Sequence, residues 1–187
     1  MSNHPSPAFR LLAIAGAALA LTACSTTRFD ASALSGQQVA ADKIGLPTSG
    51  ATVTKVEAVT AADPAKGPQP PAALRADVSI APVDPAAPAI KMALILPQEW
   101  NGKVVMLGGG GYNGTLPNLF TYPAAPASQG PYPLLSQGYA VFASDSGHQA
   151  GPAGSRDGGF GMNDEAVANF SGAALKKVSD VGDALVT

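Results

Sequence analysis

Residues 103–111, KVVMLGGGG, constrain the fold more than any other segment of this chain. A continuous apolar run without alternation is typical of a strand that is buried on both faces, as in a parallel sheet. The four glycines end that strand abruptly, because glycine lets the backbone turn sharply with its amide hydrogens pointing outward. The segment therefore predicts a buried strand followed by a tight loop.

Four further segments have the pattern of strands. Residues 51–59 alternate imperfectly between apolar and polar side chains, which predicts a strand. Residues 74–80 alternate cleanly, which predicts a half-buried strand. In residues 90–97 every second residue, starting at Ile90, is apolar and is expected to face inward. This segment is therefore expected to pair antiparallel with residues 74–80. Residues 139–143, YAVFA, predict a second strand buried on both faces.

A helix is expected near the carboxyl end, with Asn163 or Asp164 as its N-cap. Its apolar side chains recur every three or four residues, which predicts one face packed on a sheet. They are Val167, Phe170, Ala174, Val178, Val181 and Leu185. Strands, loops and a helix in this order predict an α/β architecture with part of a parallel sheet. Such a sheet calls for another strand after the helix, so the core is expected to be incomplete.

The first residues have the order of a secretory signal. Arg10 precedes an apolar run, LLAIAGAALAL, that is too short to span a bilayer. The string LTAC at residues 21–24 is similar to a bacterial lipobox, in which cleavage precedes a cysteine that is then acylated. An ordinary signal with a chance cysteine is the alternative. We expect residues 1–23 to be a lipoprotein signal peptide and Cys24 to carry the lipid.

The domain organisation follows from this signal and from composition. Residues 24–50 are small and polar without a sustained period, which predicts a flexible tether before a folded part at residues 51–187. An exported protein anchored in the outer membrane is expected, since Ser25 rather than Asp follows Cys24. Cys24 is the only cysteine, so no internal disulfide is predicted. A net charge of −2 excludes a basic nucleic-acid partner surface.

The glycine run at residues 108–111 has three interpretations: a phosphate cradle, an oxyanion hole, or a plain turn. A phosphate cradle requires Gly-Lys-Ser/Thr, or Gly-x-Gly-x-x-Gly opening into a helix, and residues 112–117 are YNGTLP. A glycine-rich loop after the third strand of an α/β-hydrolase supplies one donor of the oxyanion hole. The glycines alone do not separate an oxyanion hole from a plain turn.

Three segments together resemble the tannase and feruloyl esterase family of α/β-hydrolases. They are LPQEWNGKVVMLGGGGYNG at residues 96–114, GYAVFASDSGH at residues 138–148 and NDEAVANFSGAALKKVSD at residues 163–180. WNGK at residues 100–103 is the most specific part, and the resemblance extends over about residues 90–187. The resemblance implies an α/β-hydrolase fold. It also implies an activity, the hydrolysis of carboxylic esters of aromatic acids such as gallate or ferulate. Relatives also cleave small aromatic diacid monoesters.

Matched by position, the resemblance assigns the oxyanion-hole amide to Gly111, together with Gly110. Tyr112 and Asn113 would line the acyl pocket. No metal or cofactor is expected within this chain, because the family's calcium site would lie in a lid domain further along.

Asp145, Gly147 and His148 also match a family pattern, for which a structural role is expected because an aspartate at a turn usually caps neighbouring amides. Asp145, Ser146 and His148 do not suit a compact triad, since triad members usually come from separated segments. In the resembled family the nucleophilic serine lies in a Gly-Cys-Ser-x-Gly-Gly turn after the next strand, and the catalytic acid and base follow later.

Two hypotheses follow for the function. In the first, the chain is a fragment of an exported, lipid-anchored serine ester hydrolase, inactive alone, whose substrate is a small aromatic ester. In the second, it is a non-catalytic outer-membrane lipoprotein that binds an aromatic ligand or a protein partner. The first is favoured, because the predicted helix has an apolar face and no following strand to complete the sheet.

Overall fold

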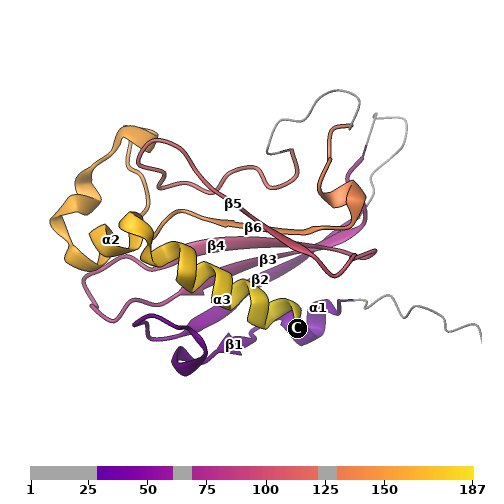
Figure 1. The fold of residues 1–187 in the computed structure, drawn as a ribbon, viewed down its shortest axis with the longest axis horizontal. Helices are drawn as coiled ribbons and strands as arrows, with labels where there is room; N and C mark the ends of the chain where they lie inside the picture. Colours follow the sequence, from indigo (N-terminus) through magenta and orange to yellow (C-terminus); the bar gives the residue numbers. More distant parts are fainter. Residues whose placement is uncertain (1–28, 61–68, 122–129) are drawn as a thin grey trace, which may run out of the picture.

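The computed structural model describes residues 29–60, 69–121 and 130–187, and within them it contains one six-stranded mixed sheet (Figure 1). The strands are β1 Gln38–Val39, β2 Ala51–Val59, β3 Ala73–Ile80, β4 Ile90–Pro97, β5 Val104–Leu107 and β6 Ala140–Ser144. Their order across the sheet is β1-β2-β3-β4-β6-β5. Neighbours are antiparallel except β5 and β6, which run parallel. The sheet and its helices give the α/β architecture that the sequence predicted.

The antiparallel pairing of β3 and β4 confirms the prediction for these two segments. Their register is unbroken from Ala73 opposite Pro97 to Ile80 opposite Ile90. In β2 the register against β3 shifts between Val53 and Lys55, which explains why the alternation of this segment is imperfect.

The two faces of the sheet carry separate apolar clusters. Met92 and Leu94 of β4 belong to the cluster under the long helix, and Ala93 and Ile95 belong to the cluster on the opposite face. β4 is therefore buried on both sides rather than on one, because neither face of the sheet is left to solvent at this strand.

The prediction of strands buried on both faces is correct for β6 and wrong for β5. All five residues of β6 are buried, whereas in β5 only Leu107 is buried and Met106 is 37% exposed. The cause is position, since β6 lies between β4 and β5 while β5 lies at the edge of the sheet. Apolar content alone does not distinguish a central strand from an edge strand.

The predicted helix forms, but as three consecutive parts. They are α2 Asp164–Ala168, a π-helical turn Asn169–Ala173 and α3 Ala174–Val186. Asn163 is the N-cap and accepts a hydrogen bond from the amide of Ala166. Gly172, with φ of 138°, interrupts the regular helical geometry, so the apolar stripe does not continue across it.

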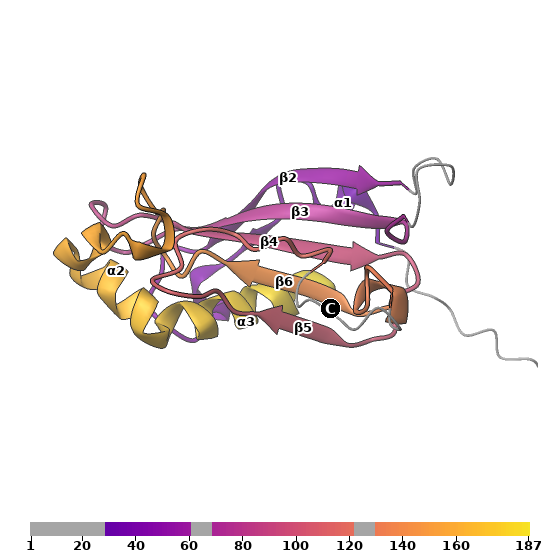
Figure 2. The same cartoon turned by 90° about the horizontal axis from the view of Figure 1, so that it is seen from above.

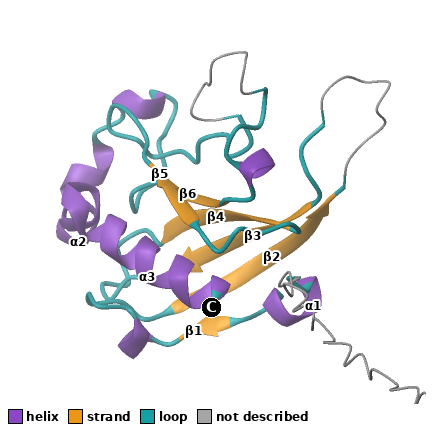
Figure 3. Cartoon of the chain, turned by 45° about the vertical axis from the view of Figure 1, so that its right-hand side comes forward, coloured by secondary structure: helices purple, strands orange, loops and turns teal. Residues whose placement is uncertain are grey.

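α3 lies along one face of the sheet (Figures 2 and 3), and the side chains that it buries there are those predicted from the spacing. Ala174, Val178, Val181 and Leu185 are buried. Gly182 allows close approach, since a Cβ there would lie 2.8 Å from the ring of Phe142 in β6. Before Gly172 the prediction fails, because Val167 is exposed and Phe170 is only half-buried.

The prediction of a flexible tether at residues 24–50 is wrong from residue 29 onward. This segment forms α1 Ala31–Leu34, β1 and a 3-10 turn Ala41–Lys43, and it closes one side of the core (Figure 3). Leu34, Val39 and Ile44 are buried in the same cluster as the inner face of α3. Isolated apolar residues that each fill a separate gap produce no period, so periodicity could not reveal them.

The predicted signal peptide, residues 1–23, and Cys24 lie outside the described residues. In the three described ranges, no helix combines the length and apolar character needed to cross a bilayer.

Candidate functional site

Two loops meet at the edge of the sheet that is formed by the ends of the strands, because β5 and β6 are parallel and their carboxyl ends both lie there. The glycine run Gly108–Gly111 follows β5, and residues 145–150 follow β6. This edge lies at the left of Figure 1, beside α2. Loops at the carboxyl ends of parallel strands are where binding sites of open α/β sheets are found.

Gly111 is a position that requires glycine. Its φ is +60°, and a Cβ there would lie 2.5 Å from the carbonyl oxygen of Ser155. The next amide, that of Tyr112, donates to this same oxygen at 2.7 Å. The backbone of residues 154–156 therefore fixes where the glycine loop turns.

The amides of Gly110 and Gly111 form no hydrogen bond to any other residue in the described ranges. Both glycines are exposed at the carboxyl end of β5. Unpaired backbone N–H groups at such a loop are donors for a negatively charged oxygen. The loop thus has the chemical property that the oxyanion interpretation needs.

Asn113 holds the glycine loop from inside. Its side chain is only 7% exposed, and its Nδ2 donates to the carbonyl oxygen of Ser144 at 3.1 Å and to Oγ of Ser146 at 2.7 Å. Its Oδ1 lies so close to Gly109 that a Cβ on that glycine would be 2.0 Å away. Asn113 was expected to line an acyl pocket, but its amide is directed at the end of β6 instead.

Backbone hydrogen bonds join the same two loops. The amide of Gly114 donates to the carbonyl oxygen of Asp145 at 3.1 Å, and the amide of Ala150 donates to that of Gly114 at 2.8 Å. Together with Asn113, these bonds make the loops after β5 and β6 one braced unit.

Asp145 has the structural role that the sequence predicted for a turn-end aspartate. Its buried carboxylate accepts from the amides of Lys91 and Gly147 and from Nε2 of Gln149. Burial raises the pKa of Asp145 above its usual value, and these hydrogen bonds oppose the rise.

The hydrogen bonds of a compact triad are not formed by Ser146, Asp145 and His148. The hydroxyl of Ser146 accepts from Asn113, and both ring nitrogens of the buried His148 have no hydrogen-bond partner among the described residues. A catalytic base must reach its nucleophile and be oriented by a third group. The structure therefore agrees with the rejection of this triad.

An aromatic cluster covers His148 beside the glycine loop. The imidazole stacks on Phe160 with ring centroids 4.0 Å apart, and Phe170 meets it edge-on at 5.9 Å. Tyr112 contacts Phe160 and Phe170 edge-on and remains 48% exposed. Sequence reasoning missed Phe160 and placed Phe170 on the sheet, because the π-helical turn that carries Phe170 has no signature in the helical period.

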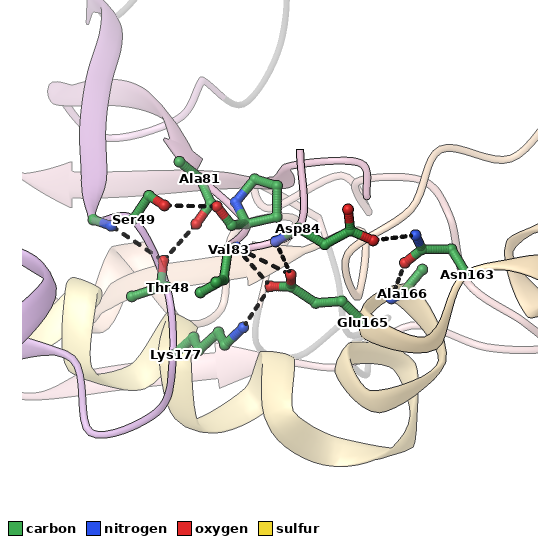
Figure 4. Close-up of polar contacts among 11 residues, drawn as sticks. Thr48, Ser49, Ala81, Val83, Asp84, Asn163, Glu165, Ala166 and Lys177 are labelled. Carbon is green, nitrogen blue, oxygen red and sulfur yellow. Dashed lines mark hydrogen bonds and ion pairs between the residues drawn. The ribbon is translucent and has the colours of Figure 1, made fainter. Parts of the chain in front are cut away.

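The carboxylate of Glu165 joins the β3–β4 connection to the helices (Figure 4). Glu165 accepts hydrogen bonds from the amides of Val83 and Asp84 and pairs with Lys177 at 3.3 Å. Asp84 in turn accepts from Nδ2 of Asn163, the N-cap of α2. The start of the helix is thereby fixed relative to the sheet.

A cleft lies at the opposite edge of the sheet, where β5 and β6 begin. It has a volume of about 690 Å³ and is bordered by the end of β2, by residues 97–99 and by residues 135–138. Its lining is mainly apolar, without the convergent donors of the glycine loop, so we place the candidate site at the loop. Over the described residues, no group of three or more His, Cys, Asp or Glu side chains is arranged to hold a metal ion.

Comparison with known proteins finds relatives of this chain that are described as esterases. An uncharacterized esterase of Agrobacterium fabrum is 42% identical over 156 residues, which cover 83% of this chain and 27% of that protein. A crystal structure of an esterase from Aspergillus oryzae matches 78% of this chain and 28% of its own, with 23% identity and a TM-score of 0.52. Feruloyl esterase B from Aspergillus oryzae matches 77% of this chain and 27% of its own, with 24% identity and a TM-score of 0.50.

These two structures share the fold of this chain, which spans between a quarter and a third of the length of the relatives it matches. The sequence profile of the family described as tannase and feruloyl esterase matches residues 73–187, more than half of the chain. The matched region contains β3 to β6, the glycine loop and the whole helix. The chain therefore belongs to the tannase and feruloyl esterase family.

Proposed function

We propose that this chain is the first part of an exported, lipid-anchored serine ester hydrolase that acts on carboxylic esters of aromatic acids. The observation that carries this proposal is the pair of unbonded amides, Gly110 and Gly111, on a rigidly braced loop. In acyl transfer, the ester carbonyl oxygen becomes negatively charged as the tetrahedral intermediate forms. Amide hydrogens already in position stabilise that oxygen, and one such donor contributes about a hundredfold or more to kcat.

In this mechanism some residues of the loop present the amides and others hold the loop in place. Gly111 presents its amide, with Gly110 beside it, and the carbonyl oxygen of Ser155 keeps Gly111 in its left-handed conformation through Tyr112. Asn113 prevents the loop from moving away from β6. The nucleophilic serine, the acid and the base are proposed to belong to a continuation of the reading frame beyond Thr187.

Tyr112 is proposed to contact the aromatic part of the ester. Its ring is half exposed next to Gly111 and already contacts Phe160 and Phe170 edge-on. An aromatic substrate ring would extend this cluster with the same geometry, which contributes about 0.5–1.5 kcal/mol per ring pair beyond the area it buries.

The anchor is a separate part of the proposal. We propose acylation of Cys24 after cleavage of residues 1–23, with the protein held at the outer membrane. Incorporation of labelled fatty acid into the expressed chain tests this, and Cys24→Ala is expected to abolish the label. Retention of label in that variant would show that the lipid is attached elsewhere.

The catalytic proposal is tested first on residues 24–187, purified and incubated with methyl gallate or methyl ferulate. No turnover is expected, because the nucleophile is proposed to lie further on. Sequencing of the gene beyond the codon for Thr187 is expected to reveal Gly-Cys-Ser-x-Gly-Gly in frame. A stop codon at that place would instead favour the second hypothesis, a lipoprotein that binds an aromatic ligand or a protein partner.

Gly111 is then tested in the product of the longer frame. Gly111→Ala is expected to lower kcat about a hundredfold with a smaller effect on KM, because the oxyanion donor is displaced. Gly108→Ala is the matched control, since a Cβ at Gly108 meets no atom within 4 Å. Equal activity of the two variants would contradict the role of Gly111.

A further inference from the structure

We propose that the edge of the molecule formed by Phe29, α1 and Trp100 lies against the membrane surface, so that the glycine loop faces the aqueous phase. This inference rests on the proposed lipid at Cys24. It concerns the orientation of the folded part, which the lipid alone does not determine.

The length of chain between the lipid and the folded part limits how far the folded part can lie from the membrane. Phe29 packs on the body of the protein, and four residues, 25–28, lie between it and Cys24 in the sequence. Five steps of extended chain span at most about 18 Å. Had residues 25–50 been a free tether, as the sequence suggested, extended chain would have allowed about 90 Å. The packed N-terminal segment therefore keeps the folded part close to the bilayer.

Phe29 is fixed to the body of the protein. Its ring packs on Trp100 with centroids 5.4 Å apart. The next residue, Asp30, caps α1 by accepting from the amide of Ser32 at 2.8 Å, and α1 ends with the buried Leu34. Residues 29–34 cannot leave the body without exposing Leu34, so they do not lengthen the tether.

The attachment at Phe29 lies at the edge of the sheet where β1 and β5 begin. Four successive antiparallel pairs lead across the sheet from β1 to β6, so β1 and β6 run in the same direction. β5 is parallel to β6 and therefore also runs in the direction of β1. α1 precedes β1 and Trp100 precedes β5, so both lie at the edge where these strands begin. The glycine loop follows the end of β5.

The attachment and the glycine loop are therefore at opposite edges. Figures 1 and 2 agree, because α1 and the region of α2 lie toward opposite ends of the longest axis. A membrane that touches the edge near Phe29 leaves the loop open to solution. The esters that reach it would be water-borne molecules rather than lipids embedded in the same bilayer.

Trp100 is a built-in probe for this arrangement, since it is the only tryptophan in the chain. The lipidated protein is reconstituted into phosphatidylcholine vesicles that carry dansyl-labelled headgroups, and energy transfer from tryptophan to dansyl is measured. Trp100 reports the proposed membrane edge. The double variant Trp100→Phe with Met162→Trp moves the donor to the opposite edge, at a position that is 93% exposed.

A second variant changes only the tether. Thirty Gly and Ser residues inserted between Thr27 and Arg28 add a flexible chain with an average span of about 30 Å. We expect transfer from Trp100 to be several-fold stronger than transfer from the indole introduced at position 162. The insertion is expected to reduce transfer from Trp100 several-fold. Melting curves check that each variant is folded, and the tether variant needs no substitution in the folded part.

The outcomes separate the orientation from the anchor. If the unmodified chain floats with the vesicles and transfer is equal from both donor positions and for both tether lengths, the anchor stands and the orientation is wrong. If the chain does not float, as is expected for Cys24→Ala, there is no anchor and the orientation falls with it.

Discussion

At the scale of single residues, Asn113 combines an unusual backbone conformation with a buried side chain. Its φ is +59°, which is costly for residues other than glycine and is tolerated best by asparagine. Its Nδ2 donates hydrogen bonds to the carbonyl oxygen of Ser144 and to Oγ of Ser146. Both the backbone and the side chain of Asn113 therefore set the shape of the glycine loop. Substitutions can separate the two contributions.

Asn113→Gly is expected to lower the free energy of unfolding by about 1–3 kcal/mol, because one buried and one partly buried hydrogen bond are lost. Asn113→Ala is expected to lose about 1–2 kcal/mol more, because alanine also strains the left-handed backbone. Urea denaturation of the purified chain measures both. Asn118→Ala, at an exposed asparagine with one local bond, is the control for a surface asparagine. If the glycine and alanine variants were equally stable, backbone strain at position 113 would play no part.

The burial of Asp145 makes its contribution to stability dependent on pH. Because burial raises its folded-state pKa above the ordinary value of 3.8, the folded protein binds this proton more tightly than the unfolded chain. The associated stability is present below that ordinary value and is lost as the pH rises through the folded-state pKa. Ionised Asp145 thus costs stability at neutral pH.

Asp145→Asn removes this titration and keeps an oxygen that can accept from Gly147 and Lys91. The free energy of unfolding of the variant relative to the parent protein is expected to rise as the pH increases from the ordinary value of 3.8 through the folded-state pKa of Asp145. Urea midpoints measured in parallel across this range give the difference directly, and effects of more distant groups largely cancel in it. A difference that is constant with pH would show that Asp145 has the same pKa in the folded and unfolded states.

At the scale of elements, Glu165 joins α2 to α3 through an ion pair and joins the helix to the β3–β4 connection through two amides. Lys177 of α3 is almost fully buried, and Glu165 of α2 is its partner while also accepting the amides of Val83 and Asp84. Removing one member of a buried pair leaves the other charge without compensation, which costs more than the pair itself contributes.

Glu165→Ala is expected to lower the free energy of unfolding by about 3–5 kcal/mol, because it leaves the Lys177 ammonium buried and two amides unpaired. Lys176→Ala is the matched control, since it breaks the exposed pair of Lys176 with Asp180 and is expected to cost about 1 kcal/mol or less. Chemical denaturation of the two variants measures the contrast. Losses of similar size would mean that the Glu165 network is no stronger than a surface pair.

At the scale of the whole molecule, the segment before β2 is part of the core. Ile44→Ala is expected to cost about 2–5 kcal/mol, because Ile44 is buried in the same cluster as Val178 and Val181. Val83→Ala, at an apolar side chain that is 57% exposed, is the control and is expected to change stability by about 0.5 kcal/mol or less. Thermal or urea unfolding distinguishes the two. A flexible tether would tolerate Ile44→Ala without loss.

Much of the fold could be predicted from local patterns. β2 and β3 follow from apolar residues in alternation, and α3 follows from apolar residues at helical spacing, because in these elements one face meets the core. The position of β4 was also predicted, although both of its faces are buried. The N-cap at Asn163 is equally local, since its side chain bonds an amide three residues away. The family follows from short motifs, which are also local.

The candidate site was predicted only in part. The glycine loop is visible in the sequence, because four adjacent glycines are rare and follow a strand. The bonds that shape it are not visible, because Asn113 reaches residues about 30 positions away and Gly111 faces Ser155. The stacking of Phe160 on His148 depends in the same way on where two loops meet.

The sequence by itself determined the strands β2 to β6, the helix, the α/β class, the family and the glycine loop, because each depends on residues that are close together in the chain. Only the tertiary structure decided that β5 lies at an edge, that residues 29–50 close the core and that Asn113 braces the loop. These depend on which distant segments come into contact. Burial and hydrogen bonding act through space, and a sequence pattern records them only when the partners are also neighbours along the chain.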